Sequence, residues 1–309
     1  MPRVSVMIPT YNCARFLGFA IDSVLTQTYA DYEIVVIDDG STDDTQECIA
    51  KYGSKVRYFY QSNQGLSAAR NLALDHATGE FIAYIDADDM WYPGKLETQV
   101  AFLDSHRECG LVHTEVSVID EQGKVIHACF NRETNRPVPQ GKCLNDLLRR
   151  CHIQVPTVME RRSWLDRAGR FDLRLLVAQD YLHWIMLAIA GAEVGYIDQA
   201  LGMYRWRQSS LMSNQWRLLD DFVKIYEIVL TEHNLERTHG AEMIEIVKEQ
   251  LYTTQRQLAY VERQECSTAT ARHRLYRLIR QWPLQLELYV DLVKTYVFRS
   301  ESQRPLNPS

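Results

Sequence analysis

The chain has 309 residues, of which 46% are hydrophobic and 24% are charged, and its formal net charge is −6. This composition is typical of a globular protein and gives no reason to expect nucleic acid as a partner. The seven cysteines are scattered without a CxxC pair, which argues against a disulfide framework or a zinc site and favours a reducing compartment.

Strands and helices are predicted to alternate over the first hundred residues. Continuous apolar and β-branched runs indicate strands at 4–9, 32–39, 56–62 and 80–86. Helical spacing of apolar residues, or a helix-ending glycine, indicates helices at 14–28, 43–53, 66–77 and 93–105. Alternation with short connections predicts an α/β fold, with a parallel sheet covered by helices on both faces.

The pattern changes from about residue 111. Strand-like stretches at 110–120 and 124–130, joined through Glu121-Gln122-Gly123, predict a hairpin, and 193–206 is another strand region. Further helices are predicted at 143–150, 163–168 and 179–190. Everything from about 215 indicates helix, so the polar stretch at 208–216 is the expected boundary between a core and a helical extension.

Three polar loops follow the predicted strands at one edge of the sheet, which is where open α/β sheets bind their ligands. They are Thr10-Tyr11-Asn12, Asp38-Asp39-Gly40-Ser41 and Asp86-Ala87-Asp88-Asp89. Tyr11 is either a ring that stacks on a nucleobase or a partly buried loop aromatic. A carboxylate at the end of a strand, such as Asp39, is suited to accept a hydrogen bond from a base N–H or a ribose hydroxyl.

The acidic cluster that contains Asp86 and Asp88 has two interpretations. Hard carboxylate oxygens next to a diphosphate suit Mg²⁺ or Mn²⁺. Alternatively, the cluster is a solvated loop that caps the following helix. Arg70 could pair with Asp38 or Asp39, or it could meet a phosphate. Trp91 either lines the bottom of a sugar or acceptor site, or it only anchors the helix that follows it.

Taken together, the motifs resemble those of the family 2 glycosyltransferases of the GT-A fold. The resemblance covers about residues 3–214, and the motifs appear in the order and at the spacings of that family. They are VSVMIPTYN, IVVIDDGSTDDT, NQGLSAARNLAL, GEFIAYIDADD followed by WYPGKLETQ, VPTVMERRSWLDRAGRFD, AQDYLHWIMLAIAG and YRWRQSSLMS.

The resemblance implies a Rossmann-like, mixed but mostly parallel sheet in a domain at 1–214, followed by a helical extension at 215–309. Within that domain, a nucleotide-binding half would span about 1–110 and an acceptor half about 111–214. It assigns the general base to Asp180 and a Mn²⁺ or Mg²⁺ ion to Asp88 together with Asp86. The expected contacts of the nucleotide sugar are Pro9, Thr10, Tyr11, Asn12, Asp39, Arg70, Asp86, Ala87 and Arg207.

Two positions depart from the family's pattern. Gln179 stands where an acid usually precedes the base, and Arg207 stands where the closing loop often carries a histidine, which puts a metal ligand there in doubt. Isolated histidines such as His183 lack ligand spacing and are expected to be structural.

The implied function is metal-dependent, inverting transfer of a sugar from a nucleoside-diphosphate sugar, commonly a UDP-sugar, to an acceptor hydroxyl. The acceptor would be a surface polysaccharide or a lipid-linked glycan. One alternative is an inactive sugar-nucleotide-binding scaffold of a glycan assembly complex, which Gln179 favours. The other is a nucleotidyltransferase, which usually needs a Gly-rich phosphate loop that PTYNCARF does not provide.

The tail at 272–299 carries six basic and two acidic residues, a net charge of +4. Leu275, Leu278, Ile279 and Trp282 recur at helical spacing. This basic amphipathic helix is expected either to lie on an anionic membrane or to pack on the protein. No stretch reaches the roughly 18 apolar residues of a membrane span and the N-terminus is no signal peptide, so the expected location is cytoplasmic, with peripheral membrane contact.

Overall fold

The computed structural model describes residues 1–207 and 214–297. The chain separates into two compact units, Met1–Ser210 and Leu211–Ser309. Most of the expected closing loop at 204–213 and Arg299 of the tail lie outside the described residues. The domain boundary expected at 214–215, and the two halves expected within the first domain, therefore stay predictions.

The first unit is built on one nine-stranded sheet with the order β3-β2-β1-β4-β8-β6-β9-β5, and β7 is paired to β6. Its strands are β1 Val4–Thr10, β2 Tyr32–Asp38, β3 Arg57–Tyr60, β4 Phe81–Tyr84, β5 Met90–Trp91, β6 Cys109–Ile119, β7 Val125–His127, β8 Met159–Arg161 and β9 Glu193–Arg205. The four strands β1 to β4 are parallel, and so are β6 and β9. The short strand β8 runs antiparallel between β4 and β6. The mixed, mostly parallel sheet is confirmed.

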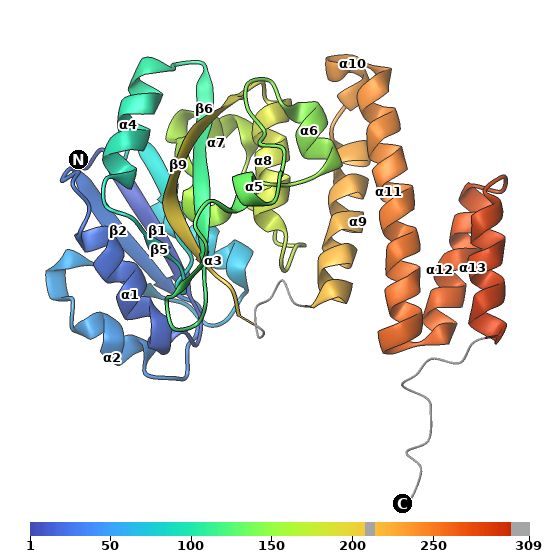
Figure 1. Ribbon diagram of the computed structural model, residues 1–309, viewed down its shortest axis with the longest axis horizontal. Coiled ribbons are helices and arrows are strands. Elements are labelled where there is room, and N and C mark those ends of the chain that lie inside the picture. The colour runs from blue at the N-terminus through green and yellow to red at the C-terminus, as the bar shows by residue number, and fades with distance from the viewer. Residues whose placement is uncertain (208–213, 298–309) are drawn as a thin grey trace, which may run out of the picture. The chain divides into compact units, whose positions relative to one another are not determined.

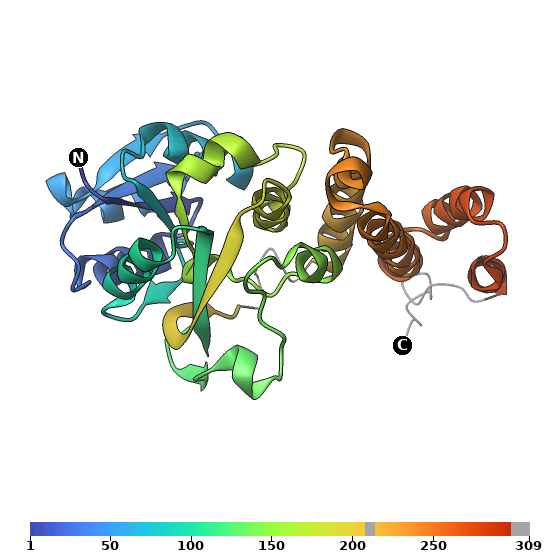
Figure 2. The same cartoon turned by 90° about the horizontal axis from the view of Figure 1, so that it is seen from above.

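Eight helices are described in this unit, and they lie on both faces of the sheet (Figures 1 and 2). They are α1 Ala14–Leu25, α2 Thr45–Ala50, α3 Leu66–His76, α4 Lys95–Ser105, α5 Phe130–Glu133, α6 Leu144–Arg149, α7 Arg162–Ala168 and α8 Gln179–Ile189. The hairpin of β6 and β7 is confirmed, but its second strand ends at His127. The end of the predicted strand at 124–130 is instead the start of α5.

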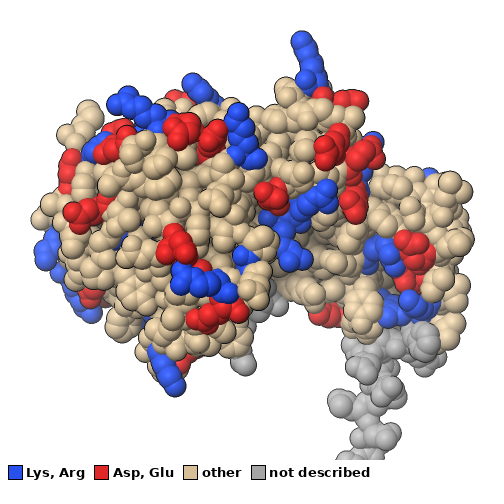
Figure 3. All heavy atoms as spheres, turned by 45° about the horizontal axis from the view of Figure 1, so that its top comes forward, with Lys and Arg blue, Asp and Glu red and all other residues tan. Residues whose placement is uncertain are grey.

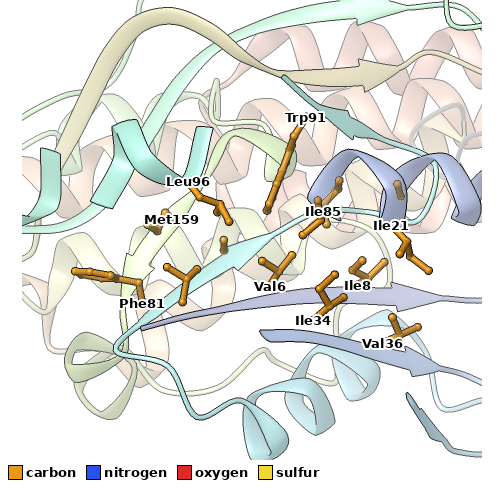
Figure 4. Close-up of a cluster of buried hydrophobic side chains, with 14 of the residues drawn as sticks. Val6, Ile8, Ile21, Ile34, Val36, Phe81, Ile85, Trp91, Leu96 and Met159 are labelled. Atoms are coloured by element: carbon orange, nitrogen blue, oxygen red, sulfur yellow. The ribbon is translucent and has the colours of Figure 1, made fainter. Parts of the chain in front are cut away.

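The core lies between the sheet and the helices α1 and α4. Because side chains alternate along a strand, Val6 and Ile8 of β1 point to the same face as Ile34 and Val36 of β2. Figure 4 shows these side chains gathered with Ile21 of α1 and with Leu96 and Trp91. Such continuous apolar runs predict buried strands because both faces of the sheet are covered.

Trp91 belongs to this core and not to a ligand site. Its side chain is buried, and its indole Nε1 donates to the carbonyl of Pro156 at 2.8 Å. The buried Nζ of Lys95, in the first turn of α4, lies 4.1 Å from the centre of the Trp91 ring. Of the two interpretations, the one in which Trp91 anchors the following helix is therefore correct.

In the second unit all regular elements within residues 214–297 are helices, as the sequence predicts for the chain after 215. Its helices are α9 Gln215–Glu232, α10 Leu235–His239, α11 Ala241–Val261, α12 Thr268–Gln281 and α13 Leu286–Val297, with a π-helical turn at Glu262–Cys266. Leu275 and Leu278 of α12 pack with Ala259 and Leu288, and Ile279 and Trp282 pack against this cluster. None of the described helices combines the length and the apolar character needed to cross a membrane.

Basic and acidic side chains are interspersed over the face of the molecule that Figure 3 displays. No large patch of only basic or only acidic side chains covers that face. Recognition of a charged ligand by the first unit should therefore depend on small groups of charged side chains, such as those at the edge of the sheet.

Candidate active site

The first two polar loops meet at the carboxyl edge of the sheet. β1 and β2 are in parallel register with Thr10 opposite Asp38, so both chains leave the sheet at the same level. The Asp39 amide donates to the Thr10 carbonyl at 2.9 Å. Asn12 joins the loops further, because its amide donates to Ser41 Oγ at 2.9 Å and its Oδ1 accepts from the Thr42 amide at 2.7 Å.

Tyr11 lies at the mouth of this edge and is 51% exposed, whereas Pro9 and Thr10 are buried in the last positions of β1. The hydroxyl of Thr10 has no hydrogen-bond partner among the described residues. An exposed ring beside a buried, unpaired hydroxyl offers a planar ligand a stacking surface and one polar contact. Both features agree with the expected nucleobase contacts, which stay predictions.

Asp38 and Asp39 are both buried but hold different parts of the edge. Asp38 accepts from the Ser41 amide at 2.8 Å and from the Tyr58 hydroxyl at 3.1 Å, so it is a structural residue. Asp39 accepts from the side chain of Gln61 and from the amides of Gln64 and Gly65 at 2.6–2.8 Å. Three of the roughly four lone-pair directions of the Asp39 carboxylate are thus used, which leaves about one for a ligand.

Arg70 pairs with the third loop, and not with Asp38 or Asp39 as the sequence suggested. Its Nη2 donates to Asp86 Oδ1 at 2.9 Å, and its guanidinium lies 5.5 Å from the centre of the Phe171 ring. Arg70 is buried, yet its Nε and Nη1 have no partner among the described residues. Buried donors without a partner are costly, so these N–H groups favour an anionic ligand.

Two arginines at the end of β9 hold the rest of the acidic loop. Arg207 forms an ion pair with Asp88. The backbone amide of Arg205 donates to Asp89 Oδ1 at 2.8 Å, and the Arg205 side chain donates to the carbonyl of Asp88 at 2.7 Å. Asp89 therefore does not cap α4, whose N-terminal cap is Gly94. The predicted capping role of this loop is wrong.

The carboxylates of the acidic loop repel one another in spite of the arginines that bind them. Burial first, and then the charge of Asp86, raises the pKa of Asp88. Burial also raises the pKa of Asp89, to which the charges of Asp88 and Asp86 add. A further cation at this loop would relieve that repulsion.

Asp180 lies in the first turn of α8, close enough to the acidic loop to interact electrostatically with Asp86. Burial raises the pKa of its carboxyl group, the positive charge of Arg70 lowers it, and the negative charge of Asp86 raises it again. A carboxylate whose pKa is raised toward neutrality is a stronger base than an exposed one. The neighbouring Gln179 is buried, and its Oε1 has no partner among the described residues.

A buried network connects the strand of the acidic loop to α8. The carboxylate of Glu160 on β8 accepts from the hydroxyl of Tyr84, the last residue of β4. Its other oxygen lies 3.0 Å from His183 Nε2, one turn after Asp180. His183 is thus structural, as expected. The network fixes α8 relative to β4 and thereby fixes the position of Asp180 in the first turn of α8.

The amino-acid sequence of this edge matches a known family. The profile described as Glycosyl transferase family 2 matches residues 5–167, more than half of the chain. The chain belongs to glycosyltransferase family 2. Among its relatives, a glycosyltransferase of Rickettsia felis is 36% identical over 205 residues, which cover 66% of this chain and 33% of that protein. The chain thus spans about a third of that relative's length.

Another family 2 relative is Escherichia coli WfgD, whose name is UDP-Glc:alpha-D-GlcNAc-diphosphoundecaprenol beta-1,3-glucosyltransferase. It is 31% identical over 237 residues, which cover 72% of this chain and 87% of WfgD. Residues 1–349 of S. aureus TarS superpose with a TM-score of 0.66 at 20% identity, covering 95% of this chain and 89% of that one. The same fragment has been solved with UDP-GlcNAc.

A mannosyltransferase of Pyrobaculum calidifontis, solved with GDP-Man and Mn²⁺, superposes with a TM-score of 0.58 at 20% identity. The match covers 96% of this chain and 87% of that one. At such identities the two solved structures show a common fold, and the GT-A fold of this family 2 chain is confirmed.

The acidic loop of this family 2 chain can hold a divalent ion only if other ligands complete the coordination of the ion. No group of three or more His, Cys, Asp and Glu side chains among residues 1–207 and 214–297 is arranged to hold a metal. Mg²⁺ and Mn²⁺, however, often take only one or two protein carboxylates and fill their remaining positions with water and phosphate oxygens. Asp88 and Asp86 offer two such carboxylates, which fits an ion that binds together with a diphosphate, and their role as metal ligands stays a prediction.

Sequence reasoning missed two residues that hold this edge in place, Arg205 and Glu160. Arg205 was inside a quoted motif, YRWRQSSLMS, but nothing in its type distinguishes an arginine that holds a loop from one that faces solvent. Glu160 was a lone acid next to the apolar residues of the motif VPTVMERRSWLDRAGRFD, and an acid beside an apolar run is a signal that could have found it.

Proposed function

We propose that this chain transfers a sugar from a nucleoside-diphosphate sugar, with UDP as the nucleotide, to an acceptor hydroxyl with inversion of the anomeric carbon. The observation that carries the proposal is the meeting of Arg70, Asp86 and Asp180 at one edge of the sheet. Arg70 is a buried cation with unpaired N–H groups, which suits binding of the diphosphate of the sugar nucleotide. The carboxylate of Asp180, whose pKa is raised, suits acceptance of a proton from the acceptor hydroxyl.

The donor would lie along the three loops. Tyr11 would stack on the base, the remaining lone pair of Asp39 would accept from a base N–H, and Asp86 and Ala87 would lie against the ribose. Arg70 and Arg207 would donate to the diphosphate, since a guanidinium fork matches phosphate oxygens. This placement is supported by the exposure of Tyr11 and by the two unpaired nitrogens of Arg70.

Asp88, with Asp86, would hold a Mn²⁺ or Mg²⁺ ion, which when bound offsets the charge that develops on the departing diphosphate. The protein's own part is to orient the reactants. Its loops fix the diphosphate, and the buried network of Tyr84, Glu160 and His183 keeps α8 in place beside them.

Asp180 would act on the acceptor. As the acceptor oxygen bonds to the anomeric carbon, the bond from that carbon to the diphosphate oxygen breaks, and its electron pair leaves with the nucleoside diphosphate. The acceptor's proton passes to the carboxylate of Asp180. Attack from the face opposite the leaving group in one displacement inverts the anomeric configuration.

The acceptor class that we propose is a cell-surface polysaccharide or a lipid-linked glycan, in the cytoplasm at the inner face of the membrane. The name of WfgD, which describes transfer to a diphosphoundecaprenol-linked sugar, supports this class for a relative that the chain covers almost completely.

The test is Asp180→Asn, which keeps the size and most hydrogen bonds of the side chain but removes its basicity. Transfer from a UDP-sugar to a lipid-linked sugar should fall by about 10²–10⁴-fold, while UDP binding stays unchanged. The matched control is Asp166→Asn, an exposed acid on α7, which should retain full activity. Normal turnover by Asp180→Asn would refute the assignment of the base. A product whose sugar keeps the anomeric configuration that it has in the UDP-sugar would refute inversion.

A further inference from the structure

Helix α13 turns its apolar side outward. Leu288 and Thr295 are buried on one side of the helix. On the opposite side Leu286, Val290, Val293 and Val297 are 76%, 53%, 58% and 65% exposed. Their spacing of four, three and four residues places them in a single stripe along the helix. Leu284, just before the helix, is also exposed and extends this surface, here called the α13 face.

The α13 face lies within the tail at 272–299, where the sequence predicts either membrane contact or packing, but it is not the stripe on α12 that the sequence singled out. The apolar stripe of α12, with Leu275, Leu278 and Trp282, packs inside the unit. For α12 the packed interpretation is therefore correct. Helices α12 and α13 lie side by side (Figures 1 and 2). Because Leu288 is buried in their common core, the exposed α13 face on the opposite side of the helix is directed away from it. A contiguous exposed apolar stripe usually marks a docking surface.

Tyrosines border the α13 face on one side. Tyr289 and Tyr296 of α13 and Tyr276 of α12 are all exposed, and the hydroxyls of Tyr276 and Tyr296 lie 3.0 Å apart. The guanidinium of Arg272 lies 3.8 Å from the centre of the Tyr296 ring. Rings with one apolar and one polar end are favoured at the level of lipid headgroups, where both ends are satisfied.

Helices α12 and α13 are rich in basic residues although the chain is negative overall, and one of these residues, Arg274, is paired with Glu262. Residues 268–297 contain five basic and two acidic side chains, a net charge of +3 against −6 for the whole chain. Both acids are already paired, Glu287 with Tyr252 and Arg256, and Asp291 with Arg256 and Lys294. Arg277 and Arg280 are exposed, and no ion pair joins either of them to another described residue.

We propose that the α13 face docks on an anionic lipid surface, with its aliphatic side chains inserted at the headgroup boundary and Arg277 and Arg280 facing lipid phosphates. A second copy of the chain is the competing occupant. Charge argues against it, because pairing two α13 faces would bring their excess cations together, whereas anionic headgroups complement them. The proposal is independent of the proposed function, because docking needs neither donor nor acceptor.

The experiment is flotation of the full chain with vesicles of equal parts phosphatidylglycerol and phosphatidylcholine, at low and high salt. Val290→Ser combined with Val293→Ser should weaken binding at least about tenfold, since each buried methylene contributes several-fold to partitioning. Arg277→Gln and Arg280→Gln should each weaken it by about fivefold, and only at low salt. All four residues are exposed, so the variants should keep the wild-type melting temperature.

The matched control is Val125→Ser with Ile126→Ser, which removes two exposed aliphatic side chains from β7 in the first unit and should leave flotation unchanged. Three results would overturn the proposal. The wild-type chain could fail to float with the anionic vesicles, or the α13 variant could float as well as wild type. The chain could also be a dimer in light scattering that Val290→Ser with Val293→Ser dissociates, which would assign the α13 face to a second copy.

Discussion

The ion pair of Arg207 with Asp88 occupies the carboxylate that we assign to a metal ion, so the two cations should compete. The guanidinium and the carboxylate are only 24% and 19% exposed. A hydrogen bond between charged groups with so little solvent contributes about 1.5–3 kcal/mol. Because a metal ion must break this ion pair to reach Asp88, its free energy of binding is weakened by the same amount. Arg207→Gln should therefore tighten the binding of Mn²⁺ alone by about 10- to 100-fold, since 1.4 kcal/mol is tenfold.

The assay is a titration of Mn²⁺ into the nucleotide-free chain, followed by electron paramagnetic resonance of the free ion. The same variant should bind UDP more weakly in the presence of EDTA, because it loses a phosphate donor. Opposite signs in the two titrations distinguish an exchange of cations from a general loss of structure.

Arg15→Gln is the matched control. The guanidiniums of Arg15 and Arg207 lie 4.8 and 5.3 Å from the centre of the same Phe16 ring, but Arg15 pairs with Glu121 outside the acidic loop. Its replacement should change neither titration. Unchanged or weaker Mn²⁺ binding by Arg207→Gln would refute the competition.

Three further predictions concern buried charges. Since burial raises the pKa of Asp180, kcat/KM should rise with pH along an acid limb above the ordinary aspartate value of about 3.9; a limb at that value would contradict the base. Burial lowers the pKa of Lys95 well below its usual value. The folded chain then binds fewer protons than the unfolded chain, so stability in urea should increase with pH up to about 10.4, and Lys95→Met should remove this slope. Arg70→Gln leaves Asp86 unpaired and should lower the free energy of unfolding by about 1–3 kcal/mol. The exposed pair of Arg170 with Asp75 is its control, because Arg170→Gln should cost less than about 1 kcal/mol.

The carboxyl edge of the sheet with its three polar loops was predictable because its signals are local. The apolar runs of β1, β2 and β4 are long enough to indicate buried strands, and in a parallel sheet the polar residues after them must meet. Asn12 bonding to Ser41 and Thr42 follows directly from that meeting.

The partners of these residues were harder to predict because they depend on contacts distant in sequence. β8 has three residues, and its place between β4 and β6 has no periodic signal. Asp38 or Asp39 was one of the two partners considered for Arg70, the other being a phosphate, but Arg70 bonds to Asp86, and only the spacing of strands in the folded sheet decides among these carboxylates. The direction of the α13 face depends likewise on which side of the helix packs on α12.

The position of β8 has a consequence for the order in which the sheet opens. Its backbone is the only ladder between β4 and β6 among the described strands, and Glu160 is registered with Ile82 on one side and Leu111 on the other. The three residues of β8 thus join a parallel half, β1 to β4, to a mixed half that contains β5, β6, β7 and β9. Amide hydrogens of Met159 and Glu160 should exchange only when the halves part, so their exchange rates would measure the cooperativity between the two halves.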